Sequence, residues 1–287
     1  MSKVGIVILN YNDYEETWNY IDRIKNYKSL NKIVIVDNNS TDSSYDKLKK
    51  LKKGNISVIK TDENKGYAYG NNVGIKYLGD SVDYIIISNP DIIVEEKEIK
   101  KLRADMDENP EIAIVSPVIK QRGELLRGWR LPRIIDEIGM NINFFHRKVE
   151  KSLRYDEKKY NSKFTKVDVV SGCFFMVRRD VMNLVGNFDD STFLFYEENI
   201  LATKLKRINK KSYIDNEVKI THNESATINK TMASIKKYKR LKDSQKYFVK
   251  YYLRANGFQM FILRFVYYIS LIIAYIIFFI RRIFKRS

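Results

Sequence analysis

Residues 84–92 read YIIISNPDI, a strand pattern that runs directly into a polar turn. Two earlier stretches have the same form: VGIVILNYN at 4–12 and IVIVDNNSTD at 33–42. In each, an unbroken apolar run of strand length ends in Asn or Asp, as expected for strands buried on both faces of a sheet. Helical patterns separate the runs, so we expect an α/β fold with a mostly parallel sheet flanked by helices.

The alternation extends over residues 1–120. Strands are expected at 4–9, 33–36, 56–59, 84–88 and 112–115, and helices at 14–27, 45–51, 67–78 and 95–108. Residues 121–170 look like an irregular, variable insertion, after which a strand at 173–177 and helices near 180–185 and from 197 follow. Ligands of such sheets bind beyond the carboxyl ends of the strands, where the polar turns lie.

Composition excludes several classes of protein. Of the 287 residues, 44% are hydrophobic and 30% charged, which is enough for a packed core and excludes a disordered chain. The single cysteine, Cys173, excludes a disulfide scaffold and a cysteine zinc site, and fits a reducing compartment. The opening MSKVGIVILNYND reaches polar residues too early for a secretory signal, so we expect the chain to begin in the cytoplasm.

The net charge of +17 belongs to one end of the chain. Residues 201–287 hold 20 Lys and Arg against 4 Asp and Glu, which leaves 32 against 31 for residues 1–200. Because the body is nearly neutral, we expect no nucleic-acid partner.

The tail pattern suggests a membrane. Residues 230–254 are basic, with Tyr, Phe, Ile and Leu at helical spacing. The uncharged stretch 265–280 would form about 24 Å of helix, short of the ~20 residues of a usual span, and adding 258–263 makes the length adequate. We therefore expect residues 1–225 to be the catalytic domain. Residues 226–287 would be a membrane-attachment segment, with a basic amphipathic helix on the anionic inner leaflet and then a helix that spans or re-enters. The alternatives are a core helix of a soluble protein and a solvated basic face.

The motifs at the strand ends each have two interpretations. NYN after the first strand is not G-x-G-x-x-G, so it does not indicate a dinucleotide site. Asp37 could accept a hydrogen bond from a nucleotide base or ribose, or cap the next helix. NKGYAYGNNVGI at 64–75 could bring backbone and a helix N-terminus to a phosphate, or form a tight turn and cap. Asp91 in SNPDI could hold a divalent cation, or the motif could be a plain turn.

Two further motifs carry ionisable groups. Glu197 and Glu198 follow FLFY, and one could serve as a general base, although carboxylates at a helix start are also stabilised by the helix dipole. His222, in ITHNES, is one of two histidines and could be structural or a metal ligand.

In their order along residues 3–225, these motifs resemble the inverting family 2 glycosyltransferases of GT-A fold, in particular rhamnosyltransferase-like members. The resemblance implies donor-binding roles for Asn10, Tyr11, Asp37, Asn64, Gly66, Asn72, Asn89 and Asp91. It also implies that Asp91, completed by His222, holds Mn²⁺ or Mg²⁺. SGCFFMV, from residue 171, is similar to the segment that lines the acceptor side, where we place Trp129, Gly172 and Tyr196.

FYEENIL departs from the family's Glu-Asp-x-Asp-Leu motif. Glu198 takes the place of the catalytic aspartate, with Glu197 as the second candidate, and Ile200 replaces the second aspartate. The implied reaction moves a sugar from a nucleoside-diphosphate sugar, UDP- or dTDP-linked, to a hydroxyl of a lipid-linked saccharide. The process would be bacterial surface polysaccharide synthesis, such as capsule, at the cytoplasmic face of the cell membrane.

Two alternatives are weighed against this reaction. A membrane-docked, catalytically degenerate sugar-nucleotide-binding protein would fit the loss of the second aspartate. A sugar-nucleotide pyrophosphorylase would need a Gly-rich basic loop after the first strand, which NYND is not. The sugar and the acceptor are not readable from these motifs.

Overall fold

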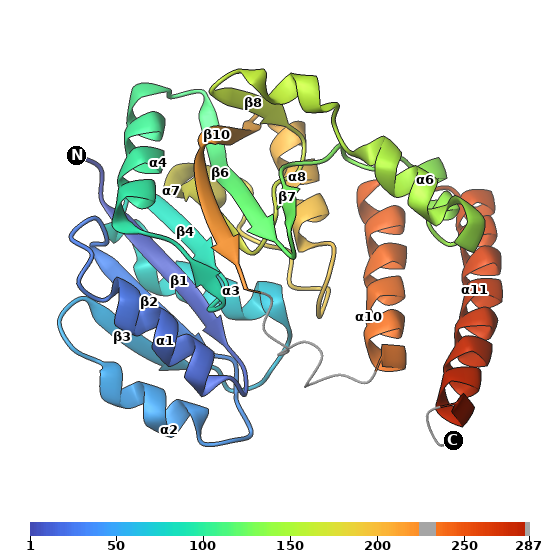
Figure 1. Cartoon of the computed structure of the whole chain (residues 1–287), viewed down its shortest axis with the longest axis horizontal. Coiled ribbons are helices and arrows are strands. Elements are labelled where there is room, and N and C mark those ends of the chain that lie inside the picture. The colour runs from blue at the N-terminus through green and yellow to red at the C-terminus, as the bar shows by residue number, and fades with distance from the viewer. Residues whose placement is uncertain (224–233, 285–287) are drawn as a thin grey trace.

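The computed structural model describes residues 1–223 and 234–284 and contains one large mixed sheet flanked by helices (Figure 1). The strand order is β3-β2-β1-β4-β9-β6-β10-β5, with β7 beside β6 and β8 beside β10. The strands are β1 (Val4–Asn10), β2 (Lys32–Asp37), β3 (Ile56–Lys60), β4 (Tyr84–Ser88), β5 (Ile92–Ile93), β6 (Ile112–Gln121), β7 (Glu124–Leu126), β8 (Phe164–Val167), β9 (Phe174–Arg178) and β10 (Lys211–His222). The α-helices are α1 (Tyr14–Ile24), α2 (Ser44–Leu48), α3 (Tyr67–Leu78), α4 (Glu96–Glu108), α5 (Ile134–Gly139), α6 (Asn143–Leu153), α7 (Arg179–Leu184), α8 (Glu197–Arg207), α10 (Ser234–Tyr247) and α11 (Gly257–Phe284).

The first half of the sheet is parallel, as expected. Strands β3, β2, β1 and β4 run in one direction, and the register places Asn10 beside Asp37 at their carboxyl ends. Helix α3 packs closely on β1 because it carries glycine at the contact: a Cβ at Gly70 would lie 2.3 Å from Leu9, and one at Gly74 2.4 Å from Val7. The strands and helices expected in residues 1–110 are confirmed, with β4 and α3 matching to the residue.

The second half of the sheet is not parallel, so the expectation of a mostly parallel sheet is wrong. Strand β9 runs antiparallel to both β4 and β6, and β10 is parallel to β6 but antiparallel to β5 and β8. Strand direction is set by the connections, and the chain between β6 and β9 is a long excursion. The hydrophobic pattern of a short buried strand carries no such information.

That excursion is more regular than its sequence suggests. Residues 121–170, read as irregular, contain β7, α5, α6 and β8, and a 3₁₀ helix, η3 (Glu157–Asn161). Helix α6 begins with exposed phenylalanines and continues with basic residues, and none of its described side chains is fully buried.

The C-terminal helices pack on the rest of the protein. After α10, a single π-helical turn, η4 (Phe248–Tyr252), leads to α11. Phe248, Val249 and Leu263 form a hydrophobic cluster with Ile200 of α8, and residues of α5 pack against it. The boundary expected at residues 225/226 and the start of the basic stretch at 230 lie outside the described residues. On the described side, the tail shares a core with the catalytic domain.

Helix α11 has two different faces. Met260, Leu263 and Tyr267 are buried toward the protein. The opposite face exposes Phe258, Phe261, Phe265, Tyr268, Ile269, Ile272, Tyr275 and Ile276, each more than a third exposed. Within residues 1–223 and 234–284, no helix combines the length and apolar character needed to cross a bilayer.

Candidate active site

Asp37, a predicted base contact, is fully buried and its carboxylate is bonded within the protein. Asn10 Nδ2 donates to its Oδ2 at 2.7 Å, and the backbone N–H and hydroxyl of Ser40 donate at 2.9 and 2.7 Å. Asn10 is equally buried and accepts from Thr17 at 2.9 Å. The structure gives this pair a role in fixing the turn after β2, and the predicted contact of Asp37 and Asn10 with the donor stays a prediction.

The Gly- and Asn-rich segment 64–75 also makes its contacts within the protein. Gly66 has φ 107°, and a Cβ there would lie 1.9 Å from the carbonyl oxygen of Phe193. Asn72 donates to Phe188 O and accepts from Phe188 N–H, both at 3.0 Å. Asn64 Oδ1 accepts from Gly66 N–H and Asn38, again at 3.0 Å. These contacts tie α3 to residues 188–193, so the segment has a packing role, and its predicted contacts with the donor stay a prediction.

Asp91 and His222 come together as predicted, on strands at one edge of the sheet. His222 Nε2 lies 3.0 Å from Asp91 Oδ1, and both side chains are about nine-tenths buried. His222 pairs with Ile92, directly after Asp91, in the β5–β10 ladder. Burial alone would lower the pKa of His222, but its hydrogen bond with Asp91 and the neighbouring Cys173 raise the pKa to about 10.

This pair fits a divalent metal. Two ligands about 2.1 Å from one ion at right angles are about 3.0 Å apart. In the described part of the chain, no group of three or more His, Cys, Asp or Glu could hold a metal ion. A hard cation such as Mg²⁺ typically takes one or two protein ligands and completes its shell with substrate phosphates and water. A cation that binds here would displace the ring proton of His222.

Glu197 and Glu198 begin α8, next to the polar turns of the sheet. Glu197 is buried, Glu198 is half-buried, and the N–H of Gly172 donates to Glu198 Oε1 at 3.2 Å. Burial raises the pKa of both carboxyl groups, and the neighbouring charge of Glu198 helps raise the pKa of Glu197 to about 8. A pKa of about 8 leaves Glu197 mostly protonated at neutral pH. The Gly172 N–H stabilises the ionised form of Glu198.

Gly172, predicted on the acceptor side, lies between Glu198 and the turn that carries Asp91. A Cβ there would lie 2.6 Å from Glu198 Oε1, so the Glu198 contact requires glycine. Tyr67 donates to Gly172 O at 2.8 Å and lies 3.4 Å from Asn89 Oδ1, and Asn89 N–H donates to Cys173 O at 2.8 Å. Asn89 belongs to the turn that carries Asp91. The backbone of residues 172–173 thus joins the Asp91 turn to the candidate base.

The model of glycosyl transferase family 2 matches residues 5–186 of this chain, well over half of it. The chain belongs to glycosyl transferase family 2. This confirms the resemblance and the enzyme class, a nucleotide-sugar-dependent glycosyltransferase. The matched part includes the Asp91 turn and Gly172, and ends before Glu197, Glu198 and His222.

Similar proteins agree with this assignment. The chain is 25% identical over 223 residues to the low-salt glycan biosynthesis hexosyltransferase Agl10 of Haloferax volcanii, a match that covers 73% of this chain and 63% of that protein. The chain thus spans less than two thirds of that relative.

Solved structures share the fold at 13–15% identity. GalNAc-T7 with UDP, GalNAc and Mn²⁺ has a TM-score of 0.61, over 77% of this chain and 44% of that one. A mannosyltransferase of Pyrobaculum calidifontis with GDP-Man and Mn²⁺ has 0.60 (89% and 65%), and TarS 1–349 of S. aureus with UDP-GlcNAc has 0.59 (91% and 70%).

Two other residues predicted on the acceptor side lie at α8. Trp129 contacts this helix, and Tyr196 directly precedes it. Trp129 Nε1 donates to Asn199, the residue after Glu198, at 3.1 Å. Tyr196 is half-buried and comes directly before Glu197; its ring lies 5.3 Å from that of Phe248, and its hydroxyl donates to Glu137 at 2.6 Å. Tyr11 is half-buried after β1. The structure therefore places Tyr196 as a support for the catalytic helix.

Sequence reasoning missed the polar group that holds Tyr196. Glu137 of α5 is fully buried and also accepts from Gln245 of α10 at 2.7 Å. Burial raises the pKa of Glu137 to about 7, while burial lowers that of neighbouring Lys242 to about 8. Ser244, next to Gln245, donates to Leu194 O at 2.8 Å. These residues lie far apart in the sequence and no local motif connects them.

Proposed function

We propose that this protein transfers a sugar from a nucleoside diphosphate to a hydroxyl of a glycan acceptor, with inversion at the anomeric carbon. The observation that carries the proposal is the pair of sites joined through residues 172–173: a half-buried Glu198 bonded by Gly172 N–H, and the Asp91–His222 pair. One can accept a proton and the other can hold the diphosphate end of the donor. The same observation disfavours the degenerate binding protein, which would need no base.

Glu198 acts as the general base. Its carboxylate is held by Gly172 N–H at the start of α8, where the helix dipole also favours its charge. It takes the proton of the acceptor hydroxyl as that oxygen attacks the anomeric carbon opposite the departing diphosphate. Glu197 keeps a proton, because burial and the charge beside it raise its pKa. A base of this kind contributes about 10²–10⁴-fold in rate.

Asp91 and His222 hold the departing end of the donor. Mn²⁺ or Mg²⁺, when bound, supplies Lewis-acid stabilisation of the diphosphate charge. A histidine beside a carboxylate favours Mn²⁺ over Mg²⁺, since imidazole is a softer ligand than oxygen. The similar structures contain UDP, UDP-GlcNAc or GDP-Man, which supports a nucleoside-diphosphate sugar as donor. We predict uridine or deoxythymidine as its nucleoside.

The C-terminal helices attach the enzyme to a membrane surface without crossing it. The outer face of α11 is apolar and aromatic, and exposed Lys236, Lys239 and Arg240 of α10 lie on the helix packed beside it (Figure 1). Lys239 lies 5.5 Å above the ring of Tyr275 on α11. Apolar rings with flanking cations suit an anionic lipid surface. We place this surface at the cytoplasmic leaflet, with a lipid-linked saccharide of bacterial surface polysaccharide synthesis as acceptor.

A nucleotide-binding experiment tests the donor site. The melting temperature of the wild type should rise with UDP, dTDP or GDP only when Mn²⁺ is present. A ligand that binds the native state stabilises that state. Asp91→Ala should lose the shift. Asp83→Ala, an aspartate before β4 and away from the site, is the control that keeps it. Absence of any metal-dependent shift in the wild type would overturn the proposed function.

Vesicle flotation tests the attachment. Phe261→Ser with Phe265→Ser should lose most binding to vesicles of 30% phosphatidylglycerol in phosphatidylcholine, because both rings are more than half exposed and carry little packing. Leu184→Ser, 64% exposed on α7, is the matched control. Equal flotation of all three proteins would contradict attachment through α11.

A further inference from the structure

A basic concavity lies on the acceptor side of the molecule. It has a volume of about 610 Å³ and is formed by α6, the chain that follows it and the segment after β7. Four basic and two acidic side chains contribute to its lining: Arg130, Arg147, Lys151 and Arg154, with Glu150 and Asp156. It is separate from the Asp91–His222 pair and from Glu198, so the proposed chemistry does not use it.

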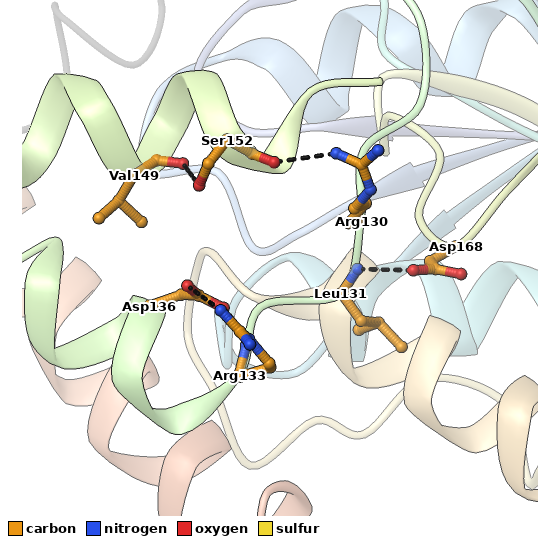
Figure 2. Close-up of polar contacts among 7 residues, drawn as sticks. All are labelled: Arg130, Leu131, Arg133, Asp136, Val149, Ser152 and Asp168. Atoms are coloured by element: carbon orange, nitrogen blue, oxygen red, sulfur yellow. Dashed lines mark hydrogen bonds and ion pairs between the residues drawn. The ribbon is translucent and has the colours of Figure 1, made fainter. Parts of the chain in front are cut away.

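Arg130 is fixed in one orientation at this concavity. Figure 2 shows its guanidinium reaching the C-terminal end of α6, where Nη1 donates to Ser152 O at 3.0 Å and to Arg154 O at 2.8 Å. The ring of Tyr155 lies 4.7 Å beneath it. A helix C-terminus by itself repels anions, and Arg130 neutralises these carbonyl groups. The guanidinium has further N–H donors in a rigid fork, suited to phosphate oxygens.

The charges of the concavity are not balanced. Arg154 lies 3.3 Å from Glu150, and Asp156 accepts from the N–H of Lys158 at 2.9 Å, so both acidic side chains already have partners. Arg147 and Lys151 are exposed, one turn apart on α6, and form no ion pair with the residues that the structure describes. Four basic against two acidic side chains leave the concavity with an excess of two positive charges.

The concavity is connected to the catalytic helix. Trp129, which bonds to Asn199 beside Glu198, directly precedes Arg130 and pairs with Arg154 and Val169 as isolated bridges. Leu131 N–H donates to Asp168 at 3.0 Å, which fixes the other side of this segment (Figure 2). An acceptor whose hydroxyl reaches Glu198 would extend past Trp129 toward Arg130.

We propose that this concavity binds a phosphate or diphosphate group of the acceptor, through Arg147, Lys151 and Arg130. The inference rests on the proposed function and narrows the acceptor to a phosphate-bearing glycan, such as one carried on a lipid diphosphate. Arg and Lys with free donors form charge-assisted bonds with phosphate oxygens, and the Arg fork does so in a bidentate manner. A neutral saccharide would gain nothing from these cations.

Titration calorimetry with inorganic pyrophosphate tests the inference. EDTA is present throughout, so that no metal-bridged binding occurs at Asp91. Arg147→Gln with Lys151→Gln should weaken pyrophosphate binding by about tenfold or more, since two charge-assisted contacts are lost. Lys148→Gln, on the same helix but outside the concavity, should bind within twofold of the wild type. Two results would overturn the proposal. One is wild-type affinity in the double variant, and the other is no detectable binding of the wild type at about 10 mM pyrophosphate.

A second arm separates an acceptor phosphate from a lipid headgroup. The double variant should float with 30% phosphatidylglycerol vesicles as well as Lys148→Gln does, because α11 provides the attachment. A larger loss in flotation than in pyrophosphate affinity would assign the cations to headgroups and overturn the proposal. The nucleotide melting experiment on the wild type is independent of both arms, so failure of the donor site and failure of this subsite are distinguishable.

Discussion

The parallel half of the sheet and the segments around α8 use their polar residues in different ways. In the parallel half, the amides and carboxylates after the strands bond to one another: Asp37 to Asn10 and Ser40, and Asn72 to the backbone of Phe188. Around α8, the carboxyl groups of Glu197, Glu198 and Glu137 are crowded into low-dielectric surroundings that raise their pKa values.

The first kind of polar residue fixes the shape of a turn, whereas the second kind is suited to a chemical role. A polar group that bonds within the protein holds a turn in place and has fewer hydrogen bonds left to offer a ligand. A buried carboxyl group with a raised pKa is held at a free-energy cost, which is more common at functional sites. We therefore expect the conspicuous motifs near the first strands to set mainly the geometry of their turns, and the less conspicuous FYEEN to carry the proposed chemistry.

The largest expected effect comes from the base. Glu198→Gln should reduce kcat about 10²–10⁴-fold with donor binding retained, because it removes proton acceptance and keeps the volume of the side chain. Glu197→Gln is the matched control and should keep far more activity, since Glu197 is protonated at neutral pH. Turnover of the donor, followed by release of the nucleoside diphosphate, measures both. If Glu197→Gln is the more damaged variant, the roles of the two residues are exchanged.

The next effect concerns Glu137 and pH. Its pKa is about 7 in the folded protein, above the ordinary value near 4.5, so its contribution to stability is present at low pH and is lost as the pH rises through 7. Between pH 5.5 and 8.5 the wild type should lose about 2 kcal/mol more unfolding free energy than Glu137→Gln. Urea unfolding at both pH values measures this. Lys242 titrates in both proteins, so it largely cancels; parallel pH profiles would contradict a raised pKa.

The smallest expected effect comes from a variant that tests the role of Tyr196. Tyr196→Phe removes the bond to Glu137 but keeps the contact with Phe248, and should lower kcat by about tenfold with little change in the donor KM. The acid limb of the plot of kcat against pH should also shift, because the pKa of Glu198 depends on where its carboxyl group lies. Tyr77→Phe, an exposed tyrosine that bonds to Ser57, is the control. A change in stability alone, with kcat unchanged, would make Tyr196 merely structural.

The sequence predicted the parallel half closely because each local signal there agrees with the tertiary structure. Residues 67–78 and 84–88 were expected as a helix and a strand and are found so, because apolar periodicity and turn residues mark both ends. The direction of β9 and the helices within 121–170 were not predicted, because long-range connections and exposed aromatic residues determine them.

The candidate site was predicted in part. The Asp91–His222 pair was expected, and the structure brings the two together, since both follow strand ends that share an edge. The bonding of Asp37 could not be read from its motif, because a sequence shows an acceptor but not its partners. Glu137 was missed for the same reason: its partners are Tyr196 and Gln245, each far away along the chain.

The support of Tyr196 has a consequence for biosynthesis. Every strand of the sheet precedes α10 in the chain, so a growing polypeptide can complete the sheet before Ser244, Gln245 and Phe248 exist. Until then, the two left-handed residues before α8, Phe195 and Tyr196, lack the contacts that hold them in place. The enzyme is thus expected to acquire its donor pocket early in synthesis. Its proposed base would be fixed only after the C-terminal helices have been made.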